Sequence, residues 1–182
     1  TLAAEMQQAN NTLNALVDTV PSGVIGADAD GTIILVNPAA EAIMGTLVPE
    51  TVADLEGSYM LVDSTGRELP AAERPLQRAL WRGEETGNVE LTIRRPDGTR
   101  TVIVESASPL YDEAGHVVGA LTSFHDVTDR WRAEEDLRAA HDELNAVFAA
   151  LTDAVVVYDA RGIGRSVNIS GARIQGLEAA AA

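Results

Sequence analysis

Cysteine and lysine are both missing from this chain, and aromatic side chains are scarce. With no cysteine among its 182 residues, the chain contains no disulfide, no thiolate nucleophile and no cysteine metal ligand. All 13 basic residues are arginine, against 28 acidic residues, which gives a formal net charge of −15. Proteins bind nucleic acid and membrane surfaces through clustered positive charge. The acidic balance of this chain therefore argues against either partner.

Long hydrophobic runs are missing as well. Apolar residues make up 46% of the chain, which is enough for one ordinary core. No run approaches the roughly 20 apolar residues that cross a bilayer, and the N-terminus lacks the charged and then apolar pattern of a secretion signal. The sequence therefore predicts a soluble, cytoplasmic protein without direct membrane insertion.

The chain contains an internal repeat with an offset of 131 residues. Residues 13–45 align with residues 144–176 without a gap, and 11 of the 33 aligned pairs are identical. Ordinary composition would give roughly two or three identities by chance. The alignment predicts one whole module at residues 21–129 and the beginning of a second, truncated module at 152–176. Residues 177–182, which end in alanines, are interpreted as the remnant of a tag.

A helix is predicted before each module, at residues 1–20 and at residues 130–151. In both helices the apolar residues recur at steps of four and three, which is the spacing of a two-stranded coiled coil. The positions are Leu2, Met6, Ala9, Leu13, Leu16 and Val20, and then Ala133, Leu137, Ala140, Leu144, Val147 and Leu151. The spacing predicts a homodimer through these flanking helices, with packing of each helix on its own domain as the alternative.

Between the flanking helices, the sequence predicts an α+β domain. The expected elements are strands at 23–27 and 32–36, helices at 38–45 and 75–82, and a three-strand meander from 89 to 127. Asn37 is the expected N-cap of the first of these helices, and Gly45 and Gly83 are the expected helix stops. The stretch 46–70 is ambiguous, although residues 59–62 could form a short extended piece. A single five-stranded antiparallel sheet with its helices on one face satisfies this order.

Several local sequences, taken together, resemble the PAS sensor domain family. They are Val20–Ile25, Asp28–Gly31, Val36–Glu41, Arg95–Thr99, Ser108–Asp112, Gly115–Gly119 and Asp126–Arg130. No single piece is diagnostic, but their order and spacing over residues 13–130 are jointly specific. The resemblance implies a PAS-like fold and a sensory module of a bacterial-type signalling protein. The parent protein would then be a histidine kinase of a two-component system, a cyclic-dinucleotide enzyme or a regulated phosphatase, whereas no catalytic residue is expected in this chain.

The resemblance also implies that a signal leaves the module where its last strand ends. The family's Asp-x-Thr motif matches Asp126 and Thr128, and Arg130 follows two residues later. A short acid and a β-branched hydroxyl can cap the free backbone N–H groups at the start of a helix. These three residues are the predicted signal relay, and simple helix initiation is the alternative role.

Family members hold a small ligand between the sheet and the helices, or hold none and dimerise. Glu105 lies within an apolar strand, so a buried carboxylate at this position would need a partner or a raised pKa. Tyr59, Trp81 and Phe124 are further candidates for the lining of a ligand pocket, although large aromatic side chains more often form plain core.

Three arginines, Arg74, Arg78 and Arg82, recur at steps of four along one predicted helix. Such a stripe could attract an anionic ligand or pair with acidic neighbours, because arginine binds carboxylates with two hydrogen bonds. We interpret it as a solvated helix face.

The sequence leaves the cofactor unknown but disfavours three classes. The resemblance implies that a haem-binding member of the family has a ligating histidine before the meander. Residues 46–95 of this chain contain no histidine. Flavin photosensors of the family need a reactive cysteine, which is absent. The histidines His116, His125 and His141 lack the spacing of a zinc site. A noncovalently bound flavin or another organic ligand stays open.

Two functions are therefore predicted. The favoured one is a ligand-responsive PAS module that passes a signal through its C-terminal helix to the second module. The alternative is a ligand-free module for dimerisation and signal relay. In the second module, the apolar run 154–158 lacks the meander strands that it would normally pair with. We expect this run to be unordered, or to pair with an exposed sheet edge or with a partner chain.

Overall fold

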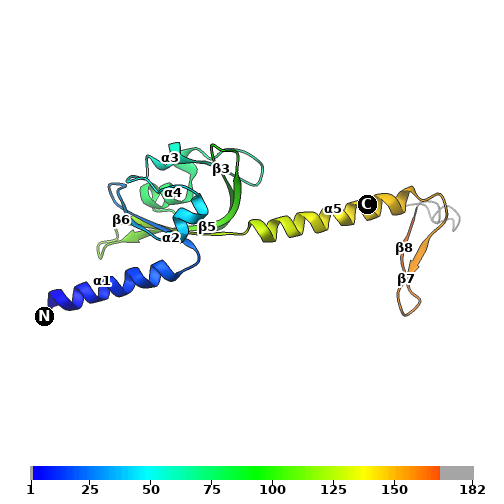
Figure 1. Cartoon of the computed structure of the whole chain (residues 1–182), viewed down its shortest axis with the longest axis horizontal. Helices are drawn as coiled ribbons and strands as arrows, with labels where there is room; N and C mark the ends of the chain where they lie inside the picture. The colour runs from blue at the N-terminus through cyan, green and yellow to red at the C-terminus, as the bar shows by residue number, and fades with distance from the viewer. Residues whose placement is uncertain (1, 169–182) are drawn as a thin grey trace. The chain divides into compact units, whose positions relative to one another are not determined.

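The computed structural model describes residues 2–168, and the chain divides into two compact units. The first unit, Thr1–Thr128, consists of a helix, α1 (Leu2–Thr19), followed by an antiparallel sheet with short helices on one face (Figure 1). The second unit, Asp129–Ala182, contains almost all of α5 (Thr128–Ala150) and a short hairpin. The end of the predicted second module and the predicted tag remnant lie outside the described residues.

The sheet of the first unit has six strands, in the order β2-β1-β6-β5-β4-β3, with every neighbouring pair antiparallel. The strands are β1 (Gly23–Asp28), β2 (Ile33–Val36), β3 (Met60–Val62), β4 (Thr86–Arg94), β5 (Arg100–Tyr111) and β6 (Val117–Asp126). The hairpin and the meander are confirmed, but the predicted number of five strands is one too few. The sixth strand is β3, which pairs with β4 at the sheet edge through Leu61 and Ile93. A three-residue strand is too short to show an alternating pattern in the sequence.

The helices that cover the sheet are α2 (Pro38–Met44), α3 (Leu55–Ser58) and α4 (Pro75–Arg82), with a short 3₁₀ helix at Ala71–Glu73. Figure 1 shows them gathered on one face, where α2 contacts β1 and α4 contacts β5 and β6. Both predicted glycine stops are confirmed, because Gly45 and Gly83 end α2 and α4 with φ angles of 69° and 64°. The hydrophobic core lies between these helices and the sheet.

The buried side chain of Asn37 joins three elements of the first unit. Its Oδ1 accepts hydrogen bonds from the backbone N–H of Val24 in β1, at 2.8 Å, and of Ala40 in α2, at 3.0 Å. Its Nδ2 donates to the carbonyl groups of Val17 in α1, at 3.0 Å, and of Ser22, at 2.9 Å. The predicted Asn cap before Pro38 is therefore confirmed, and the same side chain also holds the end of α1 at the start of the sheet.

The second unit repeats the first hairpin at the predicted offset. Strands β7 (Val156–Tyr158) and β8 (Gly164–Val167) pair in the register of β1 and β2 moved by 131 residues, with the same irregularity. Asp28 and Asp159 each accept the backbone N–H groups two and four residues later. The expectation that the run 154–158 is unordered or pairs with another edge is wrong in this structure. A hairpin needs only the strand that follows, so it forms without the meander.

Asn168 takes the place of Asn37 in this second hairpin. Its Oδ1 accepts the backbone N–H of Val155 at 3.0 Å, and its Nδ2 donates to the carbonyl of Asp153 at 2.8 Å. Both contacts are those of Asn37 moved by 131 residues. The repeat therefore extends from residue identity to hydrogen-bond geometry.

The apolar positions that recur along α1 and α5 are exposed. Six of them have more than half of their surface accessible: Met6, Leu13, Leu16, Leu137, Leu144 and Val147. Within its own unit, each helix leaves these six side chains uncovered. Among residues 2–168 we find no helix with both the length and the apolar character that crossing a bilayer requires.

We predict that Asn37→Ala lowers the free energy of unfolding by about 3 kcal/mol, because it leaves several buried backbone groups without a hydrogen-bond partner. Chemical denaturation of the purified chain measures this change. The control is Asn10→Ala on the exposed face of α1, which is expected to raise stability by no more than about 0.7 kcal/mol through helix propensity. A loss below about 1 kcal/mol for Asn37→Ala would contradict the central role of this side chain.

Candidate functional site

A small cavity lies in the core between the sheet and the helices. Its volume is about 20 Å³, which is room for about one water molecule. Most of its walls are isoleucine, leucine and methionine side chains, together with Phe124. Five residues with polar side chains share the cavity: Tyr59, Arg74, Gln77, Glu105 and Thr122. Polar groups in an apolar core are costly unless they are paired, so their partners decide what this site can do.

Arg74 places a guanidinium group inside the core. It directly precedes Pro75, the first residue of α4, and only 2% of its surface is exposed. Its Nε donates to the carbonyl of Leu69 and its Nη2 to the carbonyl of Tyr59, both at 3.3 Å. The guanidinium carbon lies 5.2 Å from the centre of the Tyr59 ring, a cation–π contact. Within residues 2–168, Nη1 has no hydrogen-bond partner, so this buried cation keeps a free donor.

Gln77, one turn further along α4, contributes a second free donor. Its surface is 2% exposed, and its Nε2 has no hydrogen-bond partner. A buried donor without an acceptor costs about 1–3 kcal/mol. Two such donors in residues that line one cavity favour the binding of a hydrogen-bond acceptor there.

Glu105 in β5 places a carboxyl group in the same cavity. Its surface is 7% exposed, and burial raises the pKa of the carboxyl to about 7 from its ordinary value of 4.5. The hydrogen bond from Thr122 and the positive charge of Arg74 oppose this rise in pKa but are weaker than desolvation. The carboxyl therefore changes charge near neutral pH. Burial also raises the pKa of Tyr59, which keeps that hydroxyl neutral.

The hydroxyl of Thr122 lies between Glu105 and a backbone carbonyl. Thr122 Oγ1 lies 2.7 Å from Glu105 Oε1 and 3.0 Å from the carbonyl oxygen of Ser106. One hydroxyl proton serves only one of these two acceptors at a time. The donation to Glu105 is the hydrogen bond that opposes the rise in the pKa of the carboxyl.

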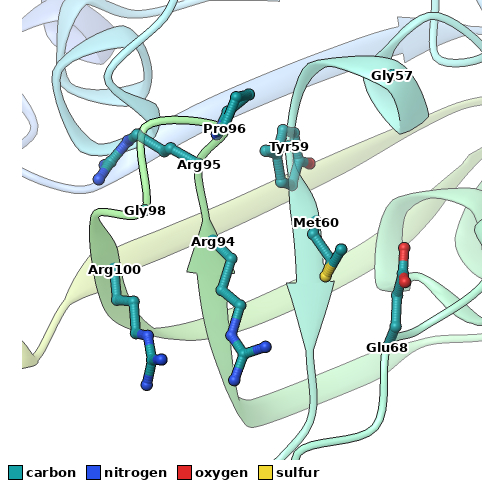
Figure 2. Close-up of a pocket in the computed structure, with 9 residues that line it drawn as sticks. All are labelled: Gly57, Tyr59, Met60, Glu68, Arg94, Arg95, Pro96, Gly98 and Arg100. Carbon is teal, nitrogen blue, oxygen red and sulfur yellow. The ribbon is translucent and has the colours of Figure 1, made fainter.

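A larger pocket of about 400 Å³ opens on the surface beside the cavity (Figure 2). Arg94 and Arg100 extend along it in the same direction and are directly opposite each other across β4 and β5. Within residues 2–168 neither guanidinium forms an ion pair, although like charges in this arrangement repel. Arg95 turns away and donates to carbonyl groups at the end of α2. Tyr59 lines both this pocket and the cavity.

The junction between β6 and α5 is held by strand β5. The N–H of Val127 donates to the carbonyl of Val102 at 2.8 Å, and Thr128 Oγ1 accepts the N–H of Val102 at 2.9 Å. Asp126 Oδ1 accepts the N–H of Thr128 at 2.8 Å. Asp126 thus caps one free N–H at the start of the helix, as expected. The hydroxyl of Thr128 does not cap the helix but binds the neighbouring strand.

Comparison with known proteins assigns this arrangement to a family. A family model described as the PAS fold matches residues 17–132, which is more than half of the chain. The chain belongs to the PAS family. It is 30% identical over 155 residues to the signal transduction histidine-protein kinase AtoS of Escherichia coli (strain K12). This match covers 85% of the present chain but only 24% of AtoS, so the PAS chain described here spans about a quarter of that relative.

Solved structures show the same fold at low sequence identity. An RNA-binding light-oxygen-voltage receptor matches with a TM-score of 0.51 and 19% identity, over 75% of this chain and 38% of the receptor chain. A PAS domain of an HTR-like protein from Haloarcula marismortui has a TM-score of 0.46 and 20% identity, over 68% of this chain and 96% of its own. By the family match and the likeness to AtoS, the chain is a PAS sensory domain that resembles the sensor regions of histidine kinases.

The PAS fold brings three of the four predicted pocket residues to the cavity. Tyr59, Glu105 and Phe124 line it, but Trp81 does not. Trp81 lies on α4 with 54% of its surface exposed, so its prediction as a pocket residue is wrong. The physical reason is its position on α4, whose inward face is already occupied by Leu76, Ala79 and Leu80.

The interpretation of the arginine stripe as a solvated face is also wrong for its first member. Arg82 is exposed and Arg78 forms an ion pair with Glu84 at 2.9 Å, but Arg74 is buried. Arg74 lies before the first residue of α4, where the chain has not yet taken up the helical spacing. Arg130, the third predicted relay residue, is exposed on α5 and forms an ion pair with Glu134 at 3.6 Å.

Sequence reasoning missed Gln77 and Thr122 as lining residues of the cavity. Gln77 stands next to Leu76 on the apolar side of α4, where a polar residue is unexpected, and this could have marked it. Thr122 carried no such signal, because a threonine is ordinary in a strand.

Because folded Glu105 holds its proton up to a pH of about 7, whereas the unfolded chain releases it near 4.5, stability falls as the pH rises between these values. The size of this fall is about 3 kcal/mol. We predict that Glu105→Gln removes this pH-dependent loss of stability. From pH 5 to pH 8 the variant should therefore become increasingly more stable than the unmodified chain. Urea denaturation across this range measures the difference. The control, Glu90→Gln on the exposed side of β4, should keep the original pH dependence, and parallel curves for Glu105→Gln would refute the prediction.

Proposed function

We propose that residues 21–129 form a sensory PAS domain that binds a small ligand at the cavity and relays its presence into α5. The observation that carries this proposal is the buried pair of unpartnered donors, Arg74 Nη1 and Gln77 Nε2, in residues that line one cavity with Glu105. A group placed only for packing would not keep free donors there at a cost of about 1–3 kcal/mol each. The likeness to a histidine kinase supports a role in signal transduction.

The route from the cavity to the helix follows two neighbouring strands. Glu105 lies on β5, and the same strand carries Val102, which binds both Val127 and Thr128 at the exit. In the β5–β6 register, Glu105 faces Phe124, which lines the cavity two residues before Asp126. A change in charge or volume at the cavity therefore acts on the two strands that hold the first residues of α5.

The receiver in this proposal is a second PAS domain that begins at residue 152, after a linker helix at 130–151. The support is the hairpin of β7 and β8, whose register and buried asparagine repeat those of the first domain. A hairpin alone buries too little surface to be stable in isolation, so the remaining strands would come from chain beyond the described residues.

We predict that Thr128→Val uncouples the cavity from the helix while the domain still folds. Valine keeps the shape of the side chain but removes the oxygen that accepts the Val102 N–H. Hydrogen exchange of the Val102 amide should accelerate about tenfold, which corresponds to the loss of about one hydrogen bond. In the parent protein, the output should lose its response to ligand in Thr128→Val and in Asp126→Ala.

The matched control is Thr46→Val, because Thr46 lies in an exposed loop outside the exit. It should leave both the exchange rate of Val102 and the output unchanged. Full ligand response in both exit variants would refute the relay through this junction.

A ligand-free module for dimerisation and relay is the second candidate function. The observation that favours it is the exposed apolar stripe on α1 and α5, which has the spacing of a coiled coil. Dimerisation through these helices is compatible with ligand sensing, but it requires no ligand.

We predict that the purified chain is a parallel homodimer at high micromolar concentration. Light scattering should give twice the chain mass, and Leu13→Glu combined with Leu144→Glu should shift it to the monomer, because both side chains would bury charge in the seam. The control is Gln8→Glu, which lies outside the apolar stripe of α1. A monomer of the unmodified chain at this concentration would refute the dimer.

A further inference from the structure

We propose that the cavity binds a small monovalent anion, which reaches it through the arginine-lined surface pocket past Tyr59 and is taken up together with one proton on Glu105. This inference rests on the proposed ligand-binding function and specifies the chemical class of the ligand. Three properties of the cavity support it: its charges, its free hydrogen-bond donors and its volume.

The charge balance of the cavity fixes the sign of the ligand. The charged and titratable groups that line it are Arg74 at the start of α4, Glu105 on β5 and Tyr59 before β3. Tyr59 is neutral, so protonation of Glu105 leaves one unbalanced positive charge on Arg74. A buried charge without a counter-charge is strongly unfavourable, and a monovalent anion restores neutrality. When Glu105 is ionised, it already balances Arg74 and repels an anion, which makes anion and proton uptake a single coupled event.

The free donors point to the same class of ligand. Arg74 Nη1 and Gln77 Nε2 offer N–H groups and no acceptor, whereas hydrogen bonds to a charged acceptor are about twice as strong as those between neutral groups. A water molecule could accept from these donors but would leave the charge of Arg74 uncompensated. An anion satisfies both requirements.

The volume of the cavity limits the anion to a few atoms. A space of about 20 Å³ suits an ion such as chloride, or formate with a slight movement of the walls. Ligands the size of a flavin or a haem need pockets of about 300–1,000 Å³. Binding of even a small anion therefore displaces side chains that line the cavity, including side chains of β5 and β6.

The surface pocket gives an anion a route into a protein of net charge −15. Arg94 and Arg100 lie side by side there without ion-pair partners among residues 2–168, and they outnumber the one carboxylate of the pocket, Glu68 (Figure 2). Tyr59 lines both the pocket and the cavity. Positive groups at an opening raise the association rate of anions more than their affinity.

The test is isothermal titration calorimetry of the full chain with sodium formate and with sodium chloride as probes. Ionic strength is held constant with sodium gluconate, whose anion is too large for the cavity. Titrations in two buffers of different ionisation enthalpy count the protons taken up per anion. We expect uptake to rise towards one proton as the pH increases above about 7, and the affinity to fall about tenfold per pH unit in the same range.

Three variants separate this site from adventitious binding. Glu105→Gln mimics the protonated carboxyl, so it should bind the probe with an affinity that does not depend on pH and with no proton uptake. Gln77→Leu should lower the affinity about tenfold or more, because it removes a buried donor to a charged group. Arg94→Gln with Arg100→Gln should slow association and reduce its salt dependence, with a smaller effect on affinity. Glu90→Gln should behave as the unmodified chain.

The inference is overturned if formate and chloride do not bind, if binding takes up no proton, or if Glu105→Gln keeps the pH dependence of the unmodified chain. The proposed function can be distinguished from it by native mass spectrometry of the same sample. A neutral small molecule bound stoichiometrically, and lost in Gln77→Leu, would refute the anion and keep the ligand-binding site. If the chain binds neither an anion nor any other small molecule, both the anion proposal and the proposed function are refuted. Should Gln77→Leu fail to fold, the proton count in Glu105→Gln still decides.

Discussion

The burial of the Arg74 guanidinium beside the Glu105 carboxyl is the constraint on which the site depends. Removing a cation from water costs several kcal/mol, and this domain offsets the cost with two carbonyl groups, one aromatic ring and one carboxyl. The offset is incomplete, because Nη1 has no partner and the carboxyl itself gains a proton near neutral pH. The core is therefore stable but sensitive to charge, which is a suitable property for a sensory domain.

Strand β5 connects this sensitivity to the rest of the chain. It carries Glu105 at the cavity and Val102 at the exit, and only two residues lie between them. Val102 uses both of its backbone groups to hold the start of α5. In the proposed relay, movement at one end of this short segment reaches the other. Asn37 connects the sheet to the helix that precedes it, because it binds both the end of α1 and the first strand.

Local patterns made much of the fold predictable. The Asn37-Pro38 cap, the glycines that end α2 and α4, and the aspartate turns of both hairpins depend on contacts within a few residues, so the sequence contains their full cause. The repeat was detectable because it consists of identical residues at a fixed offset of 131. For β3 the sequence offered no more than a possible extended piece at 59–62, because its partner β4 lies about thirty residues away and supplies its hydrogen bonds.

The sequence by itself determined the family, the order of most elements and the repeat, because each leaves a pattern of residue types along the chain. It also marked position 105 as one where a carboxyl is unusual, but its burial comes from the structure. Only the tertiary structure decided which arginine lies inside. Arg74, Arg78 and Arg82 look equivalent in sequence. Arg74 nevertheless donates hydrogen bonds to the carbonyl groups of Leu69 and Tyr59, whereas Arg82 is exposed. It likewise placed Trp81 at the surface and Thr122 against Glu105. Burial and pairing depend on which distant strands close over a side chain, and that is a property of the assembled fold.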